Sequence, residues 1–562
     1  MASSESVIAP RTQVLTGARA GVAGAGAAAR VLGEHLAALG AEVRWEDPPS
    51  ADVEAAVRLL PPEGPPRELV VGKAGPVAEP GLVDEATAQA VCGVMHVHGR
   101  RYGAPRGLAI DYCGVTAGVL GTTGLLAGML AGEAGPTVVR TSLAEAALLT
   151  ISQYLAGAGA EDPEVVELSP GGPPFVSADG VRFEVEALQP EPWARFWAEL
   201  GAHTADIRAG WRPFQFRYAT ATAPLPPALH EAAAGRTFAE LTVAAARAEV
   251  SVCRLYSVAE HAAELGATPD VPWLVEPTAG GLPRAGVPGG RTDPLRGTVV
   301  LEAGRRIQAP LAAHVLRLLG AEVTRIEPPG GDPLRGMPPC TGGLSARWLA
   351  LNRGKDAVEL DIKSPEDRQR LHALAARSDV FLHNWAPGKA EQLGLGAADL
   401  PAGLVYAYTS GWAGRELADL PPGTDFMVQA RTGLAELVGP PDQPPAPSLL
   451  TVLDVLGGLL GAEAVLAGLL VRRQHGTGVA VESSLLGAAG TVRAATGRSG
   501  PPGFRQPVPV GQGWAVRPDD GSGHSVGVTT DLADLPADPR MSEVLDRDEH
   551  GCPALRAPWR FA

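Results

Sequence analysis

The chain has 562 residues, of which 45% are hydrophobic and 19% charged, and its formal net charge is −15. A chain of this length exceeds what one hydrophobic core can hold, so we expect about three or four domain-sized units. The acidic balance argues against nucleic acid as a partner, because phosphate backbones are bound by clustered Lys and Arg.

Cysteine usage and the absence of a leader pattern predict a cytoplasmic protein. The five cysteines are far apart and form no CxxC pair, which is typical of reduced thiols. Residues 1–13 lack a basic region followed by an apolar stretch, so no secretory signal is predicted. The apolar run 449–471 is long enough to span a bilayer, but Asp454 and Glu463 would be costly there. We therefore expect a buried helix and no membrane partner.

Two phrases occur twice in the same order. Residues 36–49, LAALGAEVRWEDPP, resemble residues 316–329, LRLLGAEVTRIEPP, and residues 111–130 resemble residues 454–470. Such self-similarity indicates an internal duplication. The stretch between the two phrases is much longer in the second copy, so the chemistry is expected there.

The first part of the chain alternates between helical and strand-like patterns. A helix is predicted over 24–39, ending at Gly40, with a short strand after it. Farther along, a hairpin over 175–187 turns at Asp179-Gly180. Helices at 190–201 and 236–249 and a strand at 250–255 complete a separate unit.

From residue 298 onward, strands alternate with helices. Strands are predicted at 298–302, 322–326, 357–361, 379–383 and 404–409, and helices at 309–319 and 365–378, the latter with Ser364 as N-cap. This alternation predicts a parallel sheet covered on both faces. The expected fold class is α/β, with Rossmann-like parallel-sheet large domains in two unequal copies and a smaller α+β domain.

The predicted domain organisation has five parts. They are a degenerate first-copy large domain at 1–165, a small α+β domain at 172–275, a linker at 276–297, a second-copy large domain at 298–498, and a Pro/Gly-rich, mostly loop tail at 499–562.

Short motifs between residues 298 and 486 occur in a characteristic order. They are Gln308-Ala309-Pro310, LGAEVTRIEPPGGDPLRG at 319–336, Asn352-Arg353-Gly354-Lys355, HNWAPG at 383–388, Ser410-Gly411-Trp412, TDFMVQARTGL at 424–434, GPPDQPP at 439–445, Asp454 and GTGVAVESSLL at 476–486. Together they resemble the family III CoA-transferases, the group that contains formyl-CoA transferase, carnitine CoA-transferase and α-methylacyl-CoA racemase. Residues 172–260 resemble the small domain of that family.

The resemblance implies a fold, a reaction and partners. Two subunits of such enzymes interlock like links of a chain, so this chain is expected to be a pseudo-dimer in itself, with a homodimer as a further possibility. The substrates would be an acyl-CoA and a carboxylic acid, with coenzyme A as part of the substrate and no metal. The reaction would proceed through an acyl anhydride and a thioester on one aspartate.

Two aspartates compete for the catalytic role. Asp442 in GPPDQPP stands where the transferases of the family have their nucleophile, although the following Gly is replaced by Gln443. An aspartate has a reference pKa of ~3.9 and is ionised at neutral pH without help. Asp425 stands where the racemases have a catalytic Asp, but the His before it is replaced by Thr424. The ordinary alternatives are a turn residue for Asp442 and a helix N-cap for Asp425.

Transferase chemistry on Asp442 is therefore the favoured prediction, and two alternatives remain open. One is a racemase or isomerase that uses Asp425, for which no second acid–base partner is evident. The other is a non-catalytic or repurposed member that binds an acyl thioester. Two cations of the family pattern are replaced by Pro328 and Gln392, and its Gly-rich loop has only 504–514 as a short stand-in.

Several further residues resemble the parts of the family that contact substrate. Gln308 resembles the Gln that touches the acyl group. The residues expected to bind CoA are Asn352, Arg353, Gly354, Lys355, Asn384, Trp385, Ser410, Gly411 and Trp412, with Lys355 facing a phosphate as a point charge.

The first half lacks these motifs. Tyr102 falls near the position of Asp442 by local spacing, and His96 with His98 is weak evidence for a metal. We therefore expect one active site per chain, built around Asp442 and covered by the small domain at 172–275.

Overall fold

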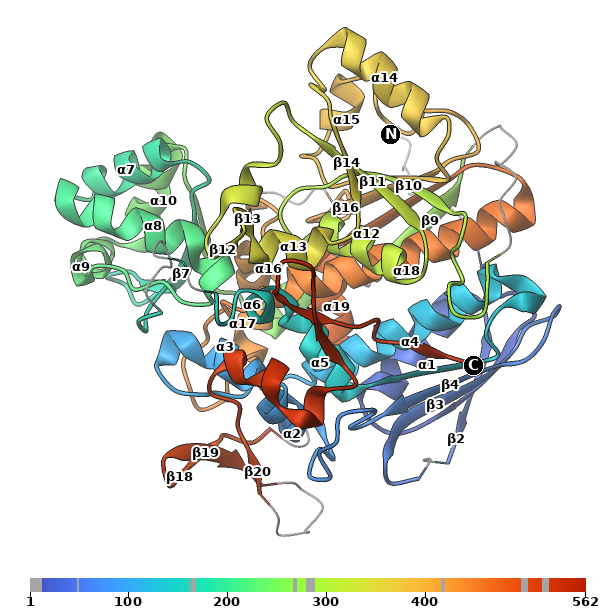
Figure 1. Ribbon diagram of the computed structural model, residues 1–562. Helices are drawn as coiled ribbons and strands as arrows, with labels where there is room; N and C mark the ends of the chain where they lie inside the picture. Colours follow the sequence, from blue (N-terminus) through green and yellow to red (C-terminus); the bar gives the residue numbers. More distant parts are fainter. Residues whose placement is uncertain are drawn as a thin grey trace.

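The computed structural model describes residues 13–47, 50–160, 162, 168–265, 270–278, 289–415, 420–496, 504–517 and 525–562. Two α/β halves lie one above the other, and a small α+β unit projects to one side of them (Figure 1). Helix α4 (Tyr112–Leu130) of the first half packs against helix α18 (Val452–His475) of the second half.

The second half is built on a seven-stranded sheet. Six strands are parallel, and the last is antiparallel to its neighbour. Their order is β14 (Asp356–Glu359), β11 (Glu322–Glu327), β10 (Val299–Ala303), β15 (Val380–His383), β16 (Val405–Ser410), β17 (Val479–Ser484) and β9 (Trp273–Pro277). The strands and helices predicted from residue 298 onward all form, and Ser364 accepts a hydrogen bond from the backbone N–H of Asp367 as N-cap of α14 (Pro365–Ala375).

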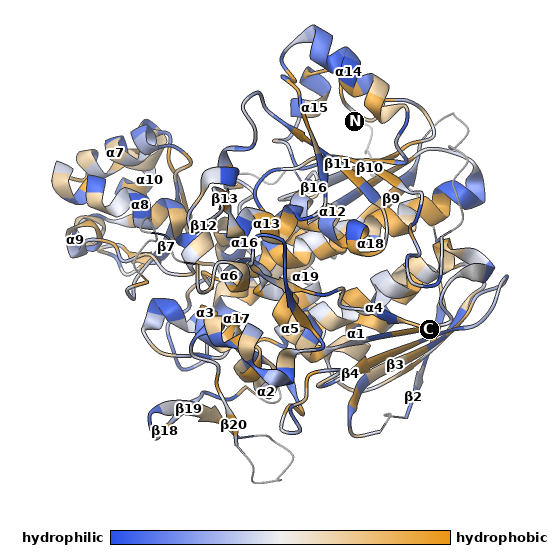
Figure 2. Cartoon of the chain, viewed as in Figure 1, coloured by the Kyte–Doolittle hydropathy of each residue, from blue (hydrophilic) through white to orange (hydrophobic). Residues whose placement is uncertain are grey.

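Helices cover both faces of this sheet. On the face toward the first half lie α12 (Gln308–Leu318), α18 and α19 (Leu485–Thr496), while α14 lies on the outer face (Figure 1). Figure 2 shows apolar residues concentrated in the helices between the two halves and polar residues along α14. Such layering buries the faces of a parallel sheet, as the sequence pattern predicted.

Helices α4 and α18 are each long and apolar enough to cross a membrane by length and composition. Their most apolar windows are 89% and 94% buried inside the protein. Because they are buried against protein all round, they are core helices, which confirms the interpretation of 449–471 as a buried helix.

The sheet of the first half is mixed, so the predicted parallel sheet is wrong there. Its order is β2 (Glu42–Glu46), β1 (Arg19–Ala23), β3 (Val53–Leu60), β4 (Arg67–Gly72), β5 (Val138–Ser142) and β23 (Arg560–Phe561). Strand β3 is antiparallel to both β1 and β4. The physical reason is the short connection between β3 and β4, which leaves no room for the helical crossover that parallel neighbours need.

The two halves repeat the same backbone pattern where the sequence repeats. The Leu15 N–H donates to the Leu39 carbonyl at 2.7 Å, and the Leu295 N–H donates to the Leu319 carbonyl at 2.9 Å. Gly40 and Gly320, which end α1 (Ala27–Ala38) and α12, have φ of 102° and 103°. Only glycine adopts this conformation without strain, so the chain turns from helix to strand in the same way in each half.

The small unit is an antiparallel sheet with a helical layer. Strands β6 (Phe175–Val176), β7 (Arg182–Glu186) and β8 (Ser251–Arg254) pair in that order, and the helices are α7 (Pro190–Glu199), α8 (Thr204–Thr220), α9 (Pro227–Ala234) and α10 (Phe238–Ala248). Its own core is aromatic, with Trp193, Phe196, Trp197 and Phe214 fully buried.

One predicted boundary is corrected by the structure. Strand β9 spans the boundary placed at 275 and pairs with β17, so it belongs to the sheet of the second half. Within its mostly non-strand tail the described part of the chain also forms six short strands, which the sequence did not predict: β18 (Val508–Val510), β19 (Gly513–Val516), β20 (Val526–Gly527), β21 (Leu545–Arg547), β22 (Pro553–Leu555) and β23. Short strands of this kind tolerate Pro and Gly at their ends, so a Pro/Gly-rich composition does not reveal them.

Candidate functional site

A cleft of about 380 Å³ lies between the small unit and the second half. The small unit contributes the end of β7 and one side of α8. The second half contributes the first turns of α16 (Asp425–Arg431) and α18, together with the loop after β10. The polar residues that line it are Glu186, Gln215, Arg217, Tyr218, Arg306, Thr424, Asp425, Thr451 and Asp454.

Asp425 is buried at the floor of this cleft and is fully hydrogen-bonded. Its carboxylate accepts hydrogen bonds from Gln429 Nε2 at 2.5 Å and from the backbone N–H groups of Leu453 and Asp454 at 2.8 and 2.7 Å. Burial, followed by the charge of Asp454, raises the pKa of Asp425 well above its usual range. Through the hydrogen bonds from Leu453 and Asp454, the Asp425 side chain caps the first turn of α18.

The interpretation of Asp425 as the N-cap of its own helix is wrong, because Thr424 occupies that position. The first half contains a matching arrangement in which Glu85 takes the place of Asp425. Glu85 accepts from Gln89 Nε2 at 2.9 Å and from the N–H groups of Cys113 and Gly114 at 2.9 and 2.8 Å. The contact joins α16 to α18 in the second half and α2 (Glu85–Val91) to α4 in the first half. Because it occurs in both halves, it is a part of the fold itself.

Asp454 is the second carboxylate of the cleft, and the first half has Asp111 near Glu85, with a pKa that burial also raises to about 6. It lies in the first turn of α18, is partly exposed in the cleft, and corresponds to Gly114 in the arrangement of the first half. Burial raises its pKa to about 6, while the nearby Arg306 acts in the opposite direction. At neutral pH the cleft therefore holds an ionised carboxylate at Asp454 beside Asp425, whose pKa is raised by burial and by the charge of Asp454.

The small unit is held over these acids by polar contacts. Arg217 Nη2 is 3.1 Å from Glu186 Oε1, and Thr424 Oγ1 donates to Glu186 Oε2 at 2.7 Å. The Arg217 guanidinium also lies 4.8 Å from the ring centre of Phe426. These contacts join β7 and α8 to the first turn of α16, so they fix the position of the cleft wall.

Asp442 lies outside this cleft. It is exposed in the loop 439–445, and its neighbour Gln443 accepts a hydrogen bond from Arg106 of the first half. Arg101 of the first half donates to the carbonyls of both Pro173 and Pro447, and so links the start of the small unit to the chain after this loop. The expectation that the small domain covers Asp442 is therefore wrong: it covers Asp425 and Asp454.

Lys355 does not face solvent, contrary to the expected phosphate contact. Its side chain is 1% exposed, and its Nζ donates to Glu302 Oε2 at 2.7 Å and to the Pro310 carbonyl at 2.8 Å. Arg353 is paired with Asp548 of the tail at 2.7 Å. Asn352 accepts from Lys355 at 3.0 Å. This loop is thus bound into the interior.

Other predicted contact residues gather at the carboxyl ends of the parallel strands. Gln308 Nε2 donates to the Ser410 carbonyl at 3.2 Å, and Asn384 exchanges two hydrogen bonds with the backbone of Arg305 at 2.8 and 2.9 Å. Ligands of open α/β sheets bind at this edge. Trp385, by contrast, is 7% exposed and packs on Phe381 inside the protein.

The turn at Gly411 and Trp412 closes against the chain before α16. A Cβ added to Gly411 would lie 2.4 Å from Gly423 Cα, and Trp412 Nε1 donates to the Pro421 carbonyl at 2.8 Å. This close approach requires glycine at Gly411. Gln392, which replaces a cation of the family pattern, ends α15 (Lys389–Gln392) and does not line the cleft.

The segment 504–514 does not close over the cleft. It forms β18 and β19, which pair with each other, while β19 also pairs with β20, and this small sheet lies against α2 of the first half (Figure 1). Arg505 is paired with Asp84 there. Gly354, in the loop expected to contact CoA, accepts a hydrogen bond from Arg317 and does not line the cleft.

The two histidines of the first half have protein partners. His98 Nδ1 is 2.9 Å from Ser448 Oγ, and His96 Nε2 is 3.5 Å from Arg100. Within the described ranges, no group of three or more metal-ligating side chains is present. Sequence reasoning missed the contribution of Arg217, Arg306 and Glu186 to the cleft, since their proximity arises only when the small unit packs on the second half.

The sequence model of the CoA-transferase family III matches residues 71–271 and 295–513. Succinyl-CoA:glutarate CoA-transferase from Mus musculus is 34% identical over 198 residues, which are 34% of this chain and 45% of that relative. The probable fatty acyl-CoA transferase Rv3272 from Mycobacterium tuberculosis is 35% identical over 202 residues, 34% of this chain and 50% of that relative.

A crystal structure of Rv3272 from M. tuberculosis matches 36% of this chain and 58% of that chain, at 33% identity and a TM-score of 0.34. This chain thus spans about half the length of the curated relatives it matches. The family match covers both halves and the small unit between them. On that match, the chain belongs to the CoA-transferase family III.

Proposed function

We propose that the protein transfers CoA from an acyl-CoA to a carboxylic acid. The observation that carries the proposal is the pair of acids at the floor of the cleft, Asp425 and Asp454, both with a pKa raised by burial, in a chain of this family. The cleft would hold the acyl group, with the ionised Asp454 facing its carbonyl.

The proposed reaction uses one enzyme carboxylate as nucleophile. A carboxylate oxygen attacks the thioester carbonyl, and CoA leaves as the thiolate, giving an acyl–enzyme anhydride. The thiolate then attacks the carbonyl of the enzyme residue, which releases the donor acid and leaves an aspartyl thioester. The acceptor carboxylate attacks this thioester, and the thiolate attacks the new anhydride, so acceptor acyl-CoA forms and the aspartate is regenerated.

Two residues are candidates for that carboxylate. Asp442 is the candidate by motif, because it stands in the GPPDQPP segment, yet it is exposed to water, which hydrolyses a thioester. Asp454 is the candidate by position, because it is ionised in a sheltered cleft. Asp425 is less suited, because both of its carboxylate oxygens already accept hydrogen bonds, from Gln429 and from the backbone of α18.

The racemase alternative is less favoured by the same geometry. Racemisation needs an acid and a base on opposite faces of the substrate carbon. Asp425 and Asp454 are joined by a hydrogen bond of 2.7 Å from the Asp454 N–H, so they approach a bound substrate from one side.

We also infer that the chain is a fused, asymmetric pseudo-dimer with one catalytic half. The shared backbone pattern at Gly40 and Gly320 and the matching contacts of Glu85 and Asp425 support a common origin. The first half lacks the Asn-Arg-Gly-Lys and Asn-aromatic-x-Pro-Gly motifs, which supports a single catalytic half. One covalent adduct per chain is the expected stoichiometry.

Transfer is tested with the full chain, a panel of acyl-CoA donors and isotope-labelled acids. The names of the relatives suggest succinyl-CoA and acetyl-CoA as donors and glutarate, malate and oxalate as acceptors. Labelled acyl-CoA should form, and Asp454→Asn or Asp442→Asn should abolish it, whereas the exposed Asp534→Asn should not. Failure of every pair to react, with folded protein, would favour a non-catalytic binding role.

A further inference from the structure

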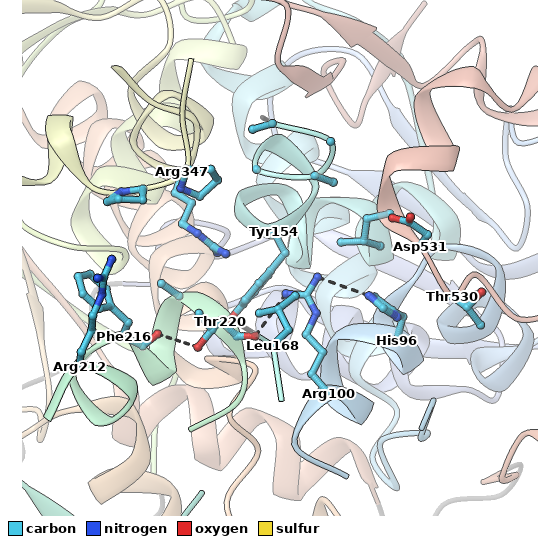
Figure 3. Close-up of a pocket in the computed structure, with 18 residues that line it drawn as sticks. His96, Arg100, Tyr154, Leu168, Arg212, Phe216, Thr220, Arg347, Thr530 and Asp531 are labelled. Atoms are coloured by element: carbon cyan, nitrogen blue, oxygen red, sulfur yellow. Dashed lines mark hydrogen bonds between the residues drawn. The ribbon is translucent and has the colours of Figure 1, made fainter. Parts of the chain in front are cut away.

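A second cavity, of about 390 Å³, lies where four parts of the chain meet (Figure 3). The first half contributes α3 (Val94–Gly99), the turn after it and α6 (Ser152–Ala156). The small unit contributes α8, the second half contributes α13 (Ala346–Asn352), and the tail contributes residues 530–532. No residue proposed above for catalysis lines this cavity.

Two arginines dominate its polar lining. Arg347 is 8% exposed, and its Nη1 is fully enclosed without a hydrogen-bond partner among the described residues. The Nε of Arg100 is likewise enclosed and unpartnered within the described part of the chain. The two guanidinium groups lie 5.2 and 5.6 Å from the ring centre of Tyr154 and point into the cavity on either side of that ring in Figure 3.

Neither arginine makes an ion pair with a carboxylate of the described residues. The acidic side chain in the lining is Asp531, which is exposed and accepts a hydrogen bond from the Ala533 N–H at 2.9 Å. Arg100 donates to the Thr220 carbonyl at 3.3 Å and faces His96 at 3.5 Å. Burial and the mutual repulsion of the two guanidinium groups lower the pKa of Arg100 to about 10.

Burial of two cations without an anion is unfavourable, because each loses its hydration and gains no opposite charge. The rest of the wall is mostly apolar, with Leu168, Phe216 and Ala219 among its residues. A guanidinium presents a planar fork of donors that matches a carboxylate. Since the described residues supply no carboxylate partner for either arginine, the lining is best matched by a ligand carboxylate that carries a short apolar body.

We propose that this cavity is a binding site for a small organic acid, whose carboxylate is held between Arg100 and Arg347. The site is separate from the cleft at Asp454, although Phe216 and Pro338 line both cavities. Tyr154 stands in the wall between them, and its hydroxyl donates to the Tyr218 carbonyl at 2.9 Å. The ligand orders four parts of the chain at once, so its binding stiffens the contact of the small unit with both halves.

Isothermal titration calorimetry on the full chain, without any CoA compound, tests the proposal. The probes are butyrate, succinate, glutarate and inorganic phosphate at low ionic strength. At least one acid should bind, and Arg347→Gln and Arg100→Gln should each weaken it about tenfold or more, since each loses a charge-assisted pair of hydrogen bonds. Arg370→Gln, which removes an exposed arginine paired with Asp367, is the control and should bind like the parent.

A second variant guards against a folding defect. Arg347→Lys keeps the charge but loses the planar fork, so it should stay folded by circular dichroism and still bind more weakly. The acid should raise the melting temperature of the parent and leave that of Arg347→Gln unchanged.

Three results would overturn the proposal: no heat with any acid, unchanged affinity in Arg347→Gln, or phosphate bound more tightly than every acid. The inference is independent of the proposed transfer, because Asp454→Asn should bind the acid normally while it fails to transfer CoA.

Discussion

The backbone N–H of Asp454 donates a hydrogen bond of 2.7 Å to the carboxylate of Asp425, so two acids share the first turn of α18. Their surroundings change the pKa of both acids. Burial raises the pKa of Asp425 well above its usual range, and it raises the pKa of Asp454 to about 6. Pairs of titratable groups with separated pKa values are typical of acid–base sites. The pair accounts for how a sheltered cleft keeps one ionised carboxylate at neutral pH.

The first prediction concerns the pH dependence of transfer. If ionised Asp454 is required, kcat/KM should rise tenfold per pH unit below about pH 6 and level off above it, because the pKa of Asp454 is about 6. Initial rates from about pH 4.5 to about pH 8 measure this. Asp442→Asn should keep the same profile if Asp442 is not the ionising group, and a profile that stays flat down to about pH 4.5 would contradict the assignment.

The second prediction concerns stability. A carboxyl group whose folded pKa is raised contributes stability below its unfolded pKa and loses it as pH rises through the folded pKa. For Asp454 this window lies between the ordinary aspartate pKa of 3.8 and about 6. Asp454→Asn should therefore be more stable than the parent at pH 8, by about 2 kcal/mol, with little difference near pH 4. Urea unfolding at the two pH values measures this.

The third prediction separates a structural role of Lys355 from a CoA contact. Its Nζ is enclosed by Glu302 and Asn352, so Lys355→Met should lower the free energy of unfolding by about 3 kcal/mol. The KM for acyl-CoA should change by less than about twofold. Lys389→Met, near the surface, serves as control. A large rise in KM with unchanged stability would restore the phosphate contact.

The fourth prediction concerns the contact between the halves. His35 Nδ1 of α1 lies 2.9 Å from Glu463 Oε1 of α18, and both side chains are buried. Glu463→Gln should destabilise the chain by about 2 kcal/mol, because a charged hydrogen bond is replaced by a neutral one. Denaturant unfolding provides the measurement. The control is Glu322→Gln at an exposed position, which should leave the free energy of unfolding nearly unchanged. Equal losses of stability in the two variants would argue against the buried pair.

The fifth prediction concerns the tail. Trp559 is 4% exposed, and its Nε1 donates to the Leu120 carbonyl of α4 at 2.8 Å. Trp559→Ala should cost about 3–5 kcal/mol through the cavity it leaves. Trp45, which is 58% exposed, gives a matched control as Trp45→Ala. Thermal unfolding measures both variants. Equal melting temperatures for Trp559→Ala and Trp45→Ala would contradict a stabilising role of the tail in the first sheet.

Local patterns were enough to predict most of the second half. The alternation of strands with helices places β10, α12 and β11 within a residue or two, because each buried strand and each helix cap leaves a local signature. The hairpin turn at Asp179-Gly180 also forms between β6 and β7. The mixed sheet of the first half escaped prediction, since the pairing of β3 with β1 is decided by contacts across the fold.

The candidate site was predictable only in part. The motifs named Gln308 and Ser410 separately as substrate-contact residues, and in the structure Gln308 Nε2 donates to the Ser410 carbonyl at 3.2 Å. They did not show that Lys355 is buried, because an ion pair with Glu302 depends on how β10 and α13 pack. Nor did they single out Asp454 as an ionised group in a cleft, since its pKa is set by burial under the small unit.

The most direct test of the account is to trap the covalent intermediate. Full chain turning over an acyl-CoA with a carboxylic acid is quenched with hydroxylamine, and peptide mass spectrometry locates the aspartyl hydroxamate. The account predicts about one modified carboxylate per chain, at Asp454 or Asp442, with no adduct on the first half. Active enzyme that shows no adduct at either residue would contradict it.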